Sequence, residues 1–354
     1  MTAQVDVSAR RRHAPLPSYT HLTRLTDDTG LFEHARHAVV RREHGYCTDD
    51  VARGLVVVSR DADRSPSMIR LAETYLTFLT HAQDDQGAFH NRLSYARNWT
   101  DQPSLGDWWG RALWGLGTAA VRSPASWIRA EAMIAFTTGA NRRSAAPHAM
   151  AFAGLGAAEV LRADPQNEQA AGLLSDAAAA VGRPGSDPLW PWPQPALSYA
   201  SGALAEVVVV AGHLLGDVAR QAAGVRMLTW LRDIQLTGGH LSALPSEGWR
   251  RGSERRQYDQ QPIEVAAFAD ACATAAQATG DAGWYDGVRH AVDWFLGAND
   301  GGAEMWDRDT GGGYDGLTPD GANLNQGAES TLALIATLQH ARNGSHTRTS
   351  VRPS

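Results

Sequence analysis

The sequence has little of several features that mark common classes of enzyme. Its 354 residues include only two cysteines, Cys47 and Cys272, too few for a disulfide framework or a four-cysteine metal site. It has no glycine-rich phosphate loop, no G-x-S-x-G motif, and no His-x-x-x-His or Cys-x-x-Cys pattern. We therefore expect neither a metal nor a nucleotide cofactor, and we expect Cys272 to be a small buried core residue.

Runs of positive charge and long apolar runs are scarce as well. The formal net charge is −6, and the basic triplet Arg10–Arg12 stands alone near the N-terminus. This balance argues against a nucleic acid or an anionic membrane as partner. No apolar run approaches the roughly 20 residues that span a bilayer, and the N-terminus lacks the apolar core of a signal peptide. We expect a cytoplasmic protein.

The feature that is present is a repeat with a period of roughly fifty residues. Six short polar segments each run into an apolar helix rich in small residues, at 48–53, 106–111, 144–149, 198–203, 258–264 and 323–329. Amphipathic outer helices are expected between them, near 67–83, 124–140, 165–181, 221–236 and 281–297. The alternation predicts an all-α fold, an (α/α)6 barrel, whose inner helices all begin around one end of a funnel.

No linker interrupts this rhythm, so we expect one domain at 19–342 between flexible tails at 1–18 and 343–354. The segment 21–37 is expected to begin with a turn at 27–30, followed by a short helix that supplies the twelfth helix of the ring. Three loops rich in glycine and aromatic residues, at 87–95, 238–244 and 301–316, are expected to form the rim.

Acidic residues cluster where the inner helices begin. Either Asp49 or Asp50 is expected to cap the first inner helix, while the other points inward beside Arg53. Asp259 is expected to cap the fifth inner helix, and Glu264 shares a face with the amides of that segment. The candidate catalytic residues are Asp49, Asp50, Asp259, Glu264 and Glu329.

Aromatic and polar residues near these acids are the candidates for binding a sugar. Flat aromatic faces stack on sugar rings, while amides and charged groups bond the hydroxyls; the alternatives are core packing for the tryptophans and a buried bracing network for the amides. The candidate substrate-binding residues are Tyr46, Arg53, His90, Arg92, Asp107, Trp108, Trp109, Trp190, Trp192, Tyr258, Gln260, Gln261, Asn325 and Gln326.

Several of these segments resemble a known bacterial family. The stretches 22–30, 44–53, 110–114, 259–264 and 325–332 are similar to members of a six-hairpin glycosidase-type family. Its members are commonly labelled "glycosyltransferase" because the domain is fused to, or encoded beside, glycosyltransferases and β-mannoside phosphorylase-like enzymes. The resemblance covers roughly 20–342 and implies a six-hairpin toroid, a carbohydrate substrate and pathway neighbours of those two kinds.

The chain departs from this family at the fourth inner helix. Where relatives tend to read Trp-Pro-Trp-Phe-Glu-Asp and Thr-Tyr-Asp-Asn-Ala-Arg-Leu-Pro-Glu, this chain has WPWPQP at 190–195 and SYASGALAE at 198–206. Three acids, an amide and an arginine are therefore missing. Either those groups are not catalytic in the family, or this protein has changed its substrate or lost turnover.

Three functions remain open from the sequence. The first is a glycoside hydrolase acting on mannose-containing oligosaccharides, with Asp50 or Asp49 as one carboxylate and Glu264 or Asp259 as the other. The second is a catalytically altered or non-catalytic sugar-binding toroid. The third is a sugar epimerase or isomerase, which needs histidine bases, for which the sequence offers His148 and His240.

Overall fold

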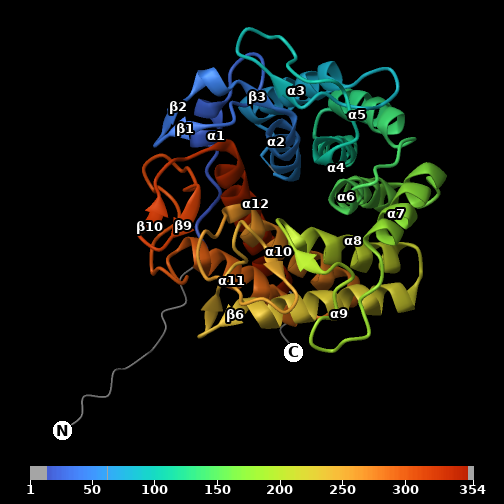
Figure 1. The fold of residues 1–354 in the computed structure, drawn as a ribbon. Coiled ribbons are helices and arrows are strands. Elements are labelled where there is room, and N and C mark those ends of the chain that lie inside the picture. Colours follow the sequence, from blue (N-terminus) through green and yellow to red (C-terminus); the bar gives the residue numbers. More distant parts are fainter. Residues whose placement is uncertain (1–13, 62, 350–354) are drawn as a thin grey trace.

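Helices arranged in a ring dominate the structure, a computed structural model that describes residues 14–61 and 63–349 (Figure 1). The inner helices are α2 (Thr48–Arg60), α4 (Asp107–Arg122), α6 (Pro147–Ala163), α8 (Ser201–Leu214), α10 (Pro262–Thr279) and α12 (Ala328–Thr349). The outer helices are α3 (Pro66–Ala82), α5 (Ser126–Gly139), α7 (Glu168–Val181), α9 (Val218–Gln235) and α11 (Tyr285–Phe295).

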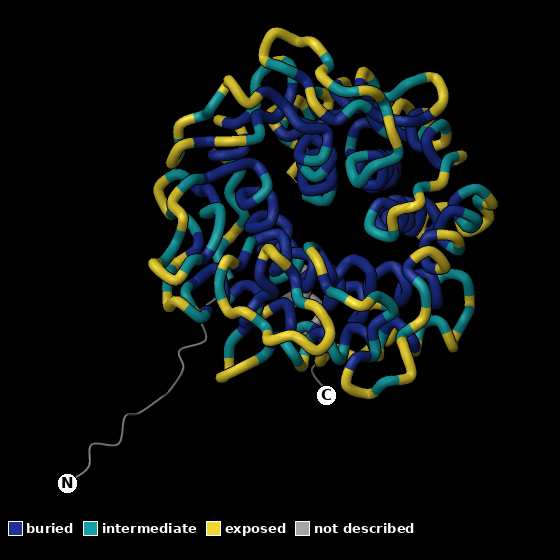
Figure 2. The backbone as a smooth tube through the Cα atoms, in the orientation of Figure 1, coloured by how far each residue is buried: buried dark blue, intermediate teal, exposed yellow. Residues whose placement is uncertain are grey.

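Each inner helix packs against the next one along the chain, and α12 packs against α2, so the ring is closed. The outer helices pack on the outside of their inner partners, and buried backbone forms the inner wall of the ring (Figure 2). Inner helices need apolar residues on several sides because they contact neighbours, an outer helix and the centre at once. The predicted (α/α)6 barrel is confirmed, with every predicted outer helix within about four residues of its observed bounds.

The N-terminal segment differs from the prediction in the order of its elements. A short helix, α1 (Thr20–Leu25), comes before the turn rather than after it. Asp27 makes the turn by accepting hydrogen bonds from the backbone N–H groups of Thr29 (2.8 Å) and Gly30 (3.2 Å). Helix α1 packs against α12. The chain after the turn forms short strands, so the expected helix there is wrong.

The connections at the rim contain short antiparallel strand pairs rather than open loops. The pairs are β1 (Ala35–Arg36) with β2 (Val39–Val40), β3 (Tyr46–Cys47) with β4 (Arg92–Leu93), β5 (Ala196–Leu197) with β8 (Trp249–Arg250), β6 (Leu236–Thr237) with β7 (His240–Leu241), and β9 (Gly316–Thr318) with β10 (Gly321–Asn323). Two 3-10 turns, η1 (Arg42–His44) and η2 (Ala282–Trp284), complete the described elements. These pairs fix the rim because each satisfies backbone groups that a free loop would leave to water.

Side-chain caps occur on outer helices and not at the predicted inner positions. Ser65, Asn167 and Asp217 cap α3, α7 and α9. Helix α2 begins one residue before Asp49 without a side-chain cap, and α10 begins at Pro262, three residues after Asp259. The expected aspartate caps are therefore wrong.

The C-terminal boundary also differs. Helix α12 continues to Thr349, seven residues past the end of the expected domain. The expected N-terminal tail lies mostly outside the described residues, as do 350–354. None of the described helices is both long and apolar enough to cross a membrane.

Glycines let α4 and α6 approach within backbone contact. A Cβ on Gly110 would lie 2.1 Å from the carbonyl oxygen of Ala149, and one on Gly156 would lie 2.2 Å from that of Leu113. Such distances are impossible without moving a helix, because the obstructing atom is backbone. The close α4–α6 seam therefore depends on these two glycines.

We predict that Gly110→Ala lowers the free energy of unfolding by about 3 kcal/mol, because it forces α4 and α6 apart. Gly172→Ala is the matched control: it lies on outer helix α7, where a Cβ would meet nothing closer than 3.9 Å, so it should raise stability by about 0.5–1 kcal/mol. Urea denaturation measures both, and equal effects at the two positions would contradict the close-packing argument.

Candidate functional site

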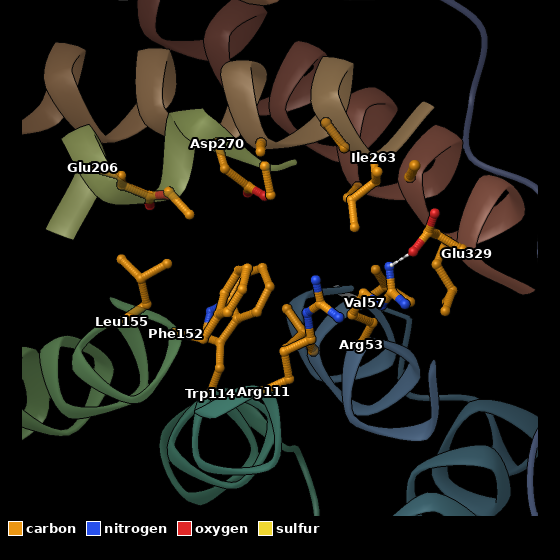
Figure 3. A pocket seen from close by; sticks show the side chains of 18 of the residues that line it. Arg53, Val57, Arg111, Trp114, Phe152, Leu155, Glu206, Ile263, Asp270 and Glu329 are labelled. Atoms are coloured by element: carbon orange, nitrogen blue, oxygen red, sulfur yellow. Dashed lines mark hydrogen bonds and ion pairs between the residues drawn. The ribbon is translucent and has the colours of Figure 1, made fainter. Parts of the chain in front are cut away.

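A pocket occupies the centre of the ring and is here called the lumen (Figure 3); its empty space of about 550 Å³ includes the part that is open to solvent. All six inner helices contribute to it, together with Ala200, the residue just before α8. Its lining is Arg53, Val56, Val57, Arg60, Arg111, Trp114, Phe152, Leu155, Ala200, Ala203, Glu206, Ile263, Ala266, Ala267, Asp270, Glu329, Leu332, Ala333 and Ala336. Because the lining comes from every helix, the lumen forms only when the ring is closed.

At the end where the inner helices begin, one arginine joins two carboxylates. Arg53 donates to Asp50 (Nη2 to Oδ1, 2.8 Å) and to Glu329 (Nη1 to Oε2, 2.7 Å). Burial raises the pKa of Asp50 to about 7, against the opposing effect of Arg53, and the nearby Glu329 raises it further. Glu329 is more open, with 38% of its side chain exposed. The two carboxylates of this pair are therefore in different environments.

A second arginine completes what we call the mouth cluster: Asp49, Asp50, Arg53, Arg111 and Glu329. Arg111 donates from Nη1 to Asp49 Oδ1 (2.8 Å) and is only 4% exposed. Its guanidinium lies 4.6 Å from the centre of the Phe152 ring. Among the described residues its Nε and Nη2 have no hydrogen-bond partner. A buried guanidinium with two unused donors, lining a cavity, is suited to bind an oxygen of a ligand.

The opposite end of the lumen is here called the floor and carries a second charged group. Arg60 and His340 both bond Asp270 Oδ1, at 2.8 and 2.5 Å. Burial works against ionisation of Asp270, but the charge of Arg60 and the hydrogen bonds from both partners outweigh it and lower its pKa. Glu206 accepts from Thr274 (2.7 Å), and burial raises its pKa, aided by the charge of Asp270. Asp270 is therefore the ionised acid and Glu206 the protonated one.

Beyond the floor lies a second pocket, which shares Arg60, Trp114, Leu155 and Glu206 with the lumen and whose empty space of about 580 Å³ includes the part open to solvent. Its own charged groups are paired: Glu159 accepts from Arg122 (2.7 and 3.1 Å) and lies 3.2 Å from Arg162. These arginines lie near the last turns of inner helices, where positive charge offsets the helix dipole. We interpret this second pocket as a structural feature at the far end of the ring.

The structure brings three of the five predicted catalytic carboxylates together and separates two. Glu329 lines the lumen, and Asp49 and Asp50 adjoin it through their arginines. Asp259 is exposed, with a positive φ of 67°. Glu264 lies outside the lumen lining. Of the five carboxylates expected in one cavity, only Glu329 lines the lumen, Asp49 and Asp50 adjoin it through their arginines, and the expectation is wrong for Asp259 and Glu264.

Glu264 has a structural task instead. It is buried and accepts the backbone N–H of Ser201 at 3.3 Å, so it satisfies an open donor at the start of α8. Burial raises its pKa to about 8, and the hydrogen bonds from Ser201 and Ala200 only partly oppose this. It braces α8 against α10, which is the bracing alternative that the sequence left open.

Two of the predicted stacking tryptophans lie in the first turn of α4. Trp109 is fully buried in the core, and the half-buried Trp108 donates its Nε1–H to the carbonyl of Phe89 (2.8 Å). Neither lines the lumen. The half-buried Asp107 beside them has a pKa raised by burial, with Arg111 opposing the shift.

The other pair belongs to an aromatic cluster under the rim. Trp190 lies 5.0 Å from both Trp230 and Trp249 between ring centres, and Trp192 lies 5.9 Å from Trp230. Both predicted residues are at least 96% buried. Their role is packing, so the prediction that one of them lines the cavity is wrong.

The remaining predicted binders are used within the rim. Tyr46 is buried and donates to Asp27 (2.7 Å), and His90 stacks on Trp99 with ring centres 4.7 Å apart. Arg92 is exposed and bonds Glu33. None of the three lines the lumen.

The predicted amides and Tyr258 brace the loops that precede α10 and α12. Gln260 is fully buried and accepts from Trp294 Nε1 (2.8 Å), Gln261 is the residue before α10, and Tyr258 donates to the carbonyl of Asp300 (3.3 Å). On the α12 side, Asn325 accepts from the backbone of His37 (3.0 Å), and Gln326 accepts from Thr310 (2.7 Å). These groups lie outside the lumen lining and support the loops beside it.

Arg60, Glu206 and Asp270 were not among the residues predicted from the sequence. The last two are single charges inside apolar runs, ALAEVVVV and AAFADACA. An isolated charge surrounded by buried small residues on an inner helix has only the centre of the ring to face. That signal was readable in the sequence.

Glu33, Cys47 and Asp50 offer ligand atoms within 4.8 Å of one another. Both carboxylates are already paired, with Arg92 and Arg53. Burial raises the pKa of the Cys47 thiol well above its usual value, which disfavours the thiolate that a metal would need. The donor set therefore suits a proton-bearing hydrogen-bond cluster better than a metal.

Comparison with known proteins identifies the fold. No protein-family model matches the chain, and no curated protein matches it in sequence. Solved structures do match. A sugar epimerase from a ruminal bacterium has a TM-score of 0.69 at 13% identity, over 92% of this chain and 95% of that one. The cellobiose 2-epimerase from Spirochaeta thermophila has 0.67 at 12% identity, over 92% and 93%.

An α-1,6-mannanase of Salegentibacter sp., in an inactive variant with α-1,6-mannotetrose, has a TM-score of 0.61 at 8% identity, over 92% of this chain and 96% of that one. The identities are low, so these matches show the (α/α)6 toroid fold and not a shared activity. The three proteins are all carbohydrate-active enzymes.

The pH dependence of stability should report the buried carboxyl of Glu264. A carboxyl whose pKa is raised by folding contributes stability below its ordinary pKa and loses it as pH rises through the folded value. We predict that Glu264→Gln gains stability over the wild type as pH rises from about 4.5 to 8, by up to about 1.4 kcal/mol per pH unit, and that the gap then stays constant. Urea denaturation at several pH values measures this.

The control is Glu131→Gln, on the exposed face of outer helix α5. It should follow the wild-type pH profile within error. A constant difference between wild type and Glu264→Gln across the whole pH range would show that folding leaves the pKa of Glu264 at its ordinary value.

Proposed function

We propose that this protein is a carbohydrate-active enzyme, most specifically a glycoside hydrolase that works at the mouth cluster. The observation that carries the proposal is Arg53, which binds Asp50 and Glu329 at once where the inner helices begin. Supporting it, the solved structures with the same toroid include carbohydrate enzymes of hydrolase and epimerase type. This proposal moves the second carboxylate from the expected Glu264 or Asp259 to Glu329.

Glycoside hydrolysis needs one carboxyl group that donates a proton and one that acts as base or nucleophile. Asp50 has a pKa raised to about 7 by burial, so a large fraction carries a proton near neutral pH. Glu329 is more exposed and ion-paired, which suits the ionised partner. Substrate binding would exchange one Arg53 ion pair for contacts to the sugar, and the free donors of Arg111 would take a hydroxyl oxygen.

For the substrate we propose a mannose-containing glycoside, which rests on the family resemblance of the sequence. Pathway neighbours of glycosyltransferase or phosphorylase type rest on the same resemblance. A screen of manno-oligosaccharides and β-mannosides for released reducing sugar, with and without phosphate, tests both the sugar and the choice between hydrolysis and phosphorolysis.

We predict that Glu329→Gln and Asp50→Asn each lower kcat at least 100-fold on any substrate found in that screen. Each change is nearly isosteric but removes proton transfer or charge stabilisation. Glu131→Gln, a surface carboxylate on α5, serves as the matched control and should keep full activity. Retention of wild-type kcat in both mouth variants would refute this assignment.

A sugar epimerase is the second candidate, and one residue favours it. His148, in the first turn of α6, stacks on Tyr199 with ring centres 4.6 Å apart, and the Tyr199 ring lies 5.5 Å from the guanidinium carbon of Arg111. Burial, together with the charge of Arg111, lowers the pKa of His148 to about 4. The imidazole is therefore neutral at pH 7 but a weak base. Its Nε2 donates to the carbonyl oxygen of Tyr199 (2.9 Å), which leaves Nδ1 to accept a proton. The other histidine considered, His240, is held by Asp300 at 2.9 Å.

The two candidates differ in what happens at C2 of the sugar. The hydrolase proposal predicts that reducing sugar is released in D2O without deuterium entering C2, as read by NMR. Deuterium uptake at C2 that disappears in His148→Asn would identify an epimerase instead, because only proton removal from carbon exchanges that hydrogen.

A further inference from the structure

Apart from its charged side chains, the described lining of the lumen is apolar. Figure 3 shows Arg53 and Glu329 on one side of the lumen, Glu206 on the other, the rings of Trp114 and Phe152 facing Asp270 between them, and Arg111 beside the rings. The apolar lining is Val56, Val57, Trp114, Phe152, Leu155, Ala200, Ala203, Ile263, Ala266, Ala267, Leu332, Ala333 and Ala336. The lumen therefore joins a charged mouth to an apolar interior.

The charged groups at the floor offer little to a ligand in this interior. Asp270 already accepts from Arg60 and His340, and Glu206 already accepts from Thr274. A sugar hydroxyl placed among the apolar side chains, out of reach of Arg111, would lose its water without gaining a partner. A second pyranose ring, with several hydroxyls, would therefore bind poorly there.

The room inside the lumen comes from small side chains on one side. Ala266 and Ala267 of α10 and Ala333 and Ala336 of α12 line it, opposite the larger residues of α2, α4 and α6. The space lies inside a closed ring of helices, so no segment of a folded partner protein can fill it. Its occupant must be a small flexible or flat group that enters from the mouth.

We propose that the substrate is an amphiphilic glycoside, whose sugar lies at the mouth cluster and whose apolar aglycone, such as an alkyl chain, lies in the lumen. This inference rests on the proposed function for the sugar end, while the apolar end rests on the lumen alone. In this arrangement the reaction takes place at the mouth cluster, and the interior of the lumen recognises the aglycone that is released.

Chain length gives a direct test by calorimetry. The probes are methyl, butyl, hexyl and octyl β-D-mannopyranosides, each below its micelle concentration, with the Glu329→Gln variant used to prevent turnover. Each methylene that enters an apolar site should tighten binding about fourfold, until the lumen is full. Equal affinity for the methyl and octyl glycosides would overturn the proposal.

Lumen-filling variants locate the effect. Ala333→Leu and Ala336→Leu should flatten the dependence on chain length, because the added side chains occupy the space. Ala219→Leu, at an exposed position of outer helix α9, makes the same chemical change outside the ring and should leave the series unchanged. An undiminished dependence in both filled variants would show that the chains bind elsewhere and overturn the proposal.

A second measurement covers the case in which the filled variants fail to fold. Trp114 lines the lumen, so octyl mannoside should change the tryptophan fluorescence of the wild type and not that of Trp114→Phe, with binding confirmed by calorimetry. An identical fluorescence change in both proteins would place the chain away from the lumen.

The two proposals fail in different ways. Chain-length dependence without cleavage of any glycoside would overturn the hydrolase and leave the apolar lumen site. Cleavage without chain-length dependence would overturn the apolar lumen site and leave the hydrolase. Binding of 1-hexanol, which has no sugar, tests the lumen alone. It should compete with octyl mannoside and not with methyl mannoside. Failure to compete with octyl mannoside would count against the proposal.

Discussion

The packing of α12 against α2 closes the ring, and the candidate site depends on that closure. The two helices are joined by the bond from Arg53 to Glu329 (2.7 Å) and by the bond from Gln339 to the carbonyl of Val57 (2.8 Å). Without this contact the inner faces of the first and last helices would be exposed to water. The carboxylate pair proposed for catalysis is itself split across the seam, with Asp50 on α2 and Glu329 on α12.

Arginine is the only basic side chain besides histidine in this protein: all 32 basic residues are arginine, and none is lysine. The guanidinium fork suits the lumen because one residue can bond two carboxylates from different helices, as Arg53 does. It also stacks on aromatic faces, as Arg60 does on Trp114 at 5.2 Å. Charged groups can therefore be placed inside an apolar ring with their partners at hand.

The helices could be predicted from the sequence because their signals are local. The apolar run of α8 and the small-residue run of α10 can be recognised as buried inner helices without knowing which elements pack against them. The mixed apolar and charged spacing of α3 is equally local. The predicted cap of α2 was wrong because Asp49 binds Arg111, 62 residues away, instead of the backbone of its own helix. A competing long-range ion pair cannot be seen in a six-residue window.

The residues of the candidate site also fall into two groups, those that local patterns predict and those whose roles depend on tertiary packing. Local sequence patterns were enough to predict the ring, the end of the ring where acids gather, and the placement of Asp49, Asp50, Arg53 and Glu329 within the first two turns of inner helices, because helical periodicity fixes which residues share a face. The roles of other residues follow from the tertiary structure: Glu264 braces α8, Trp190 and Trp192 pack under the rim, and Arg60, Glu206 and Asp270 meet at the floor. Those outcomes depend on how far apart helices lie and how they are rotated, and these are set by packing across the whole ring.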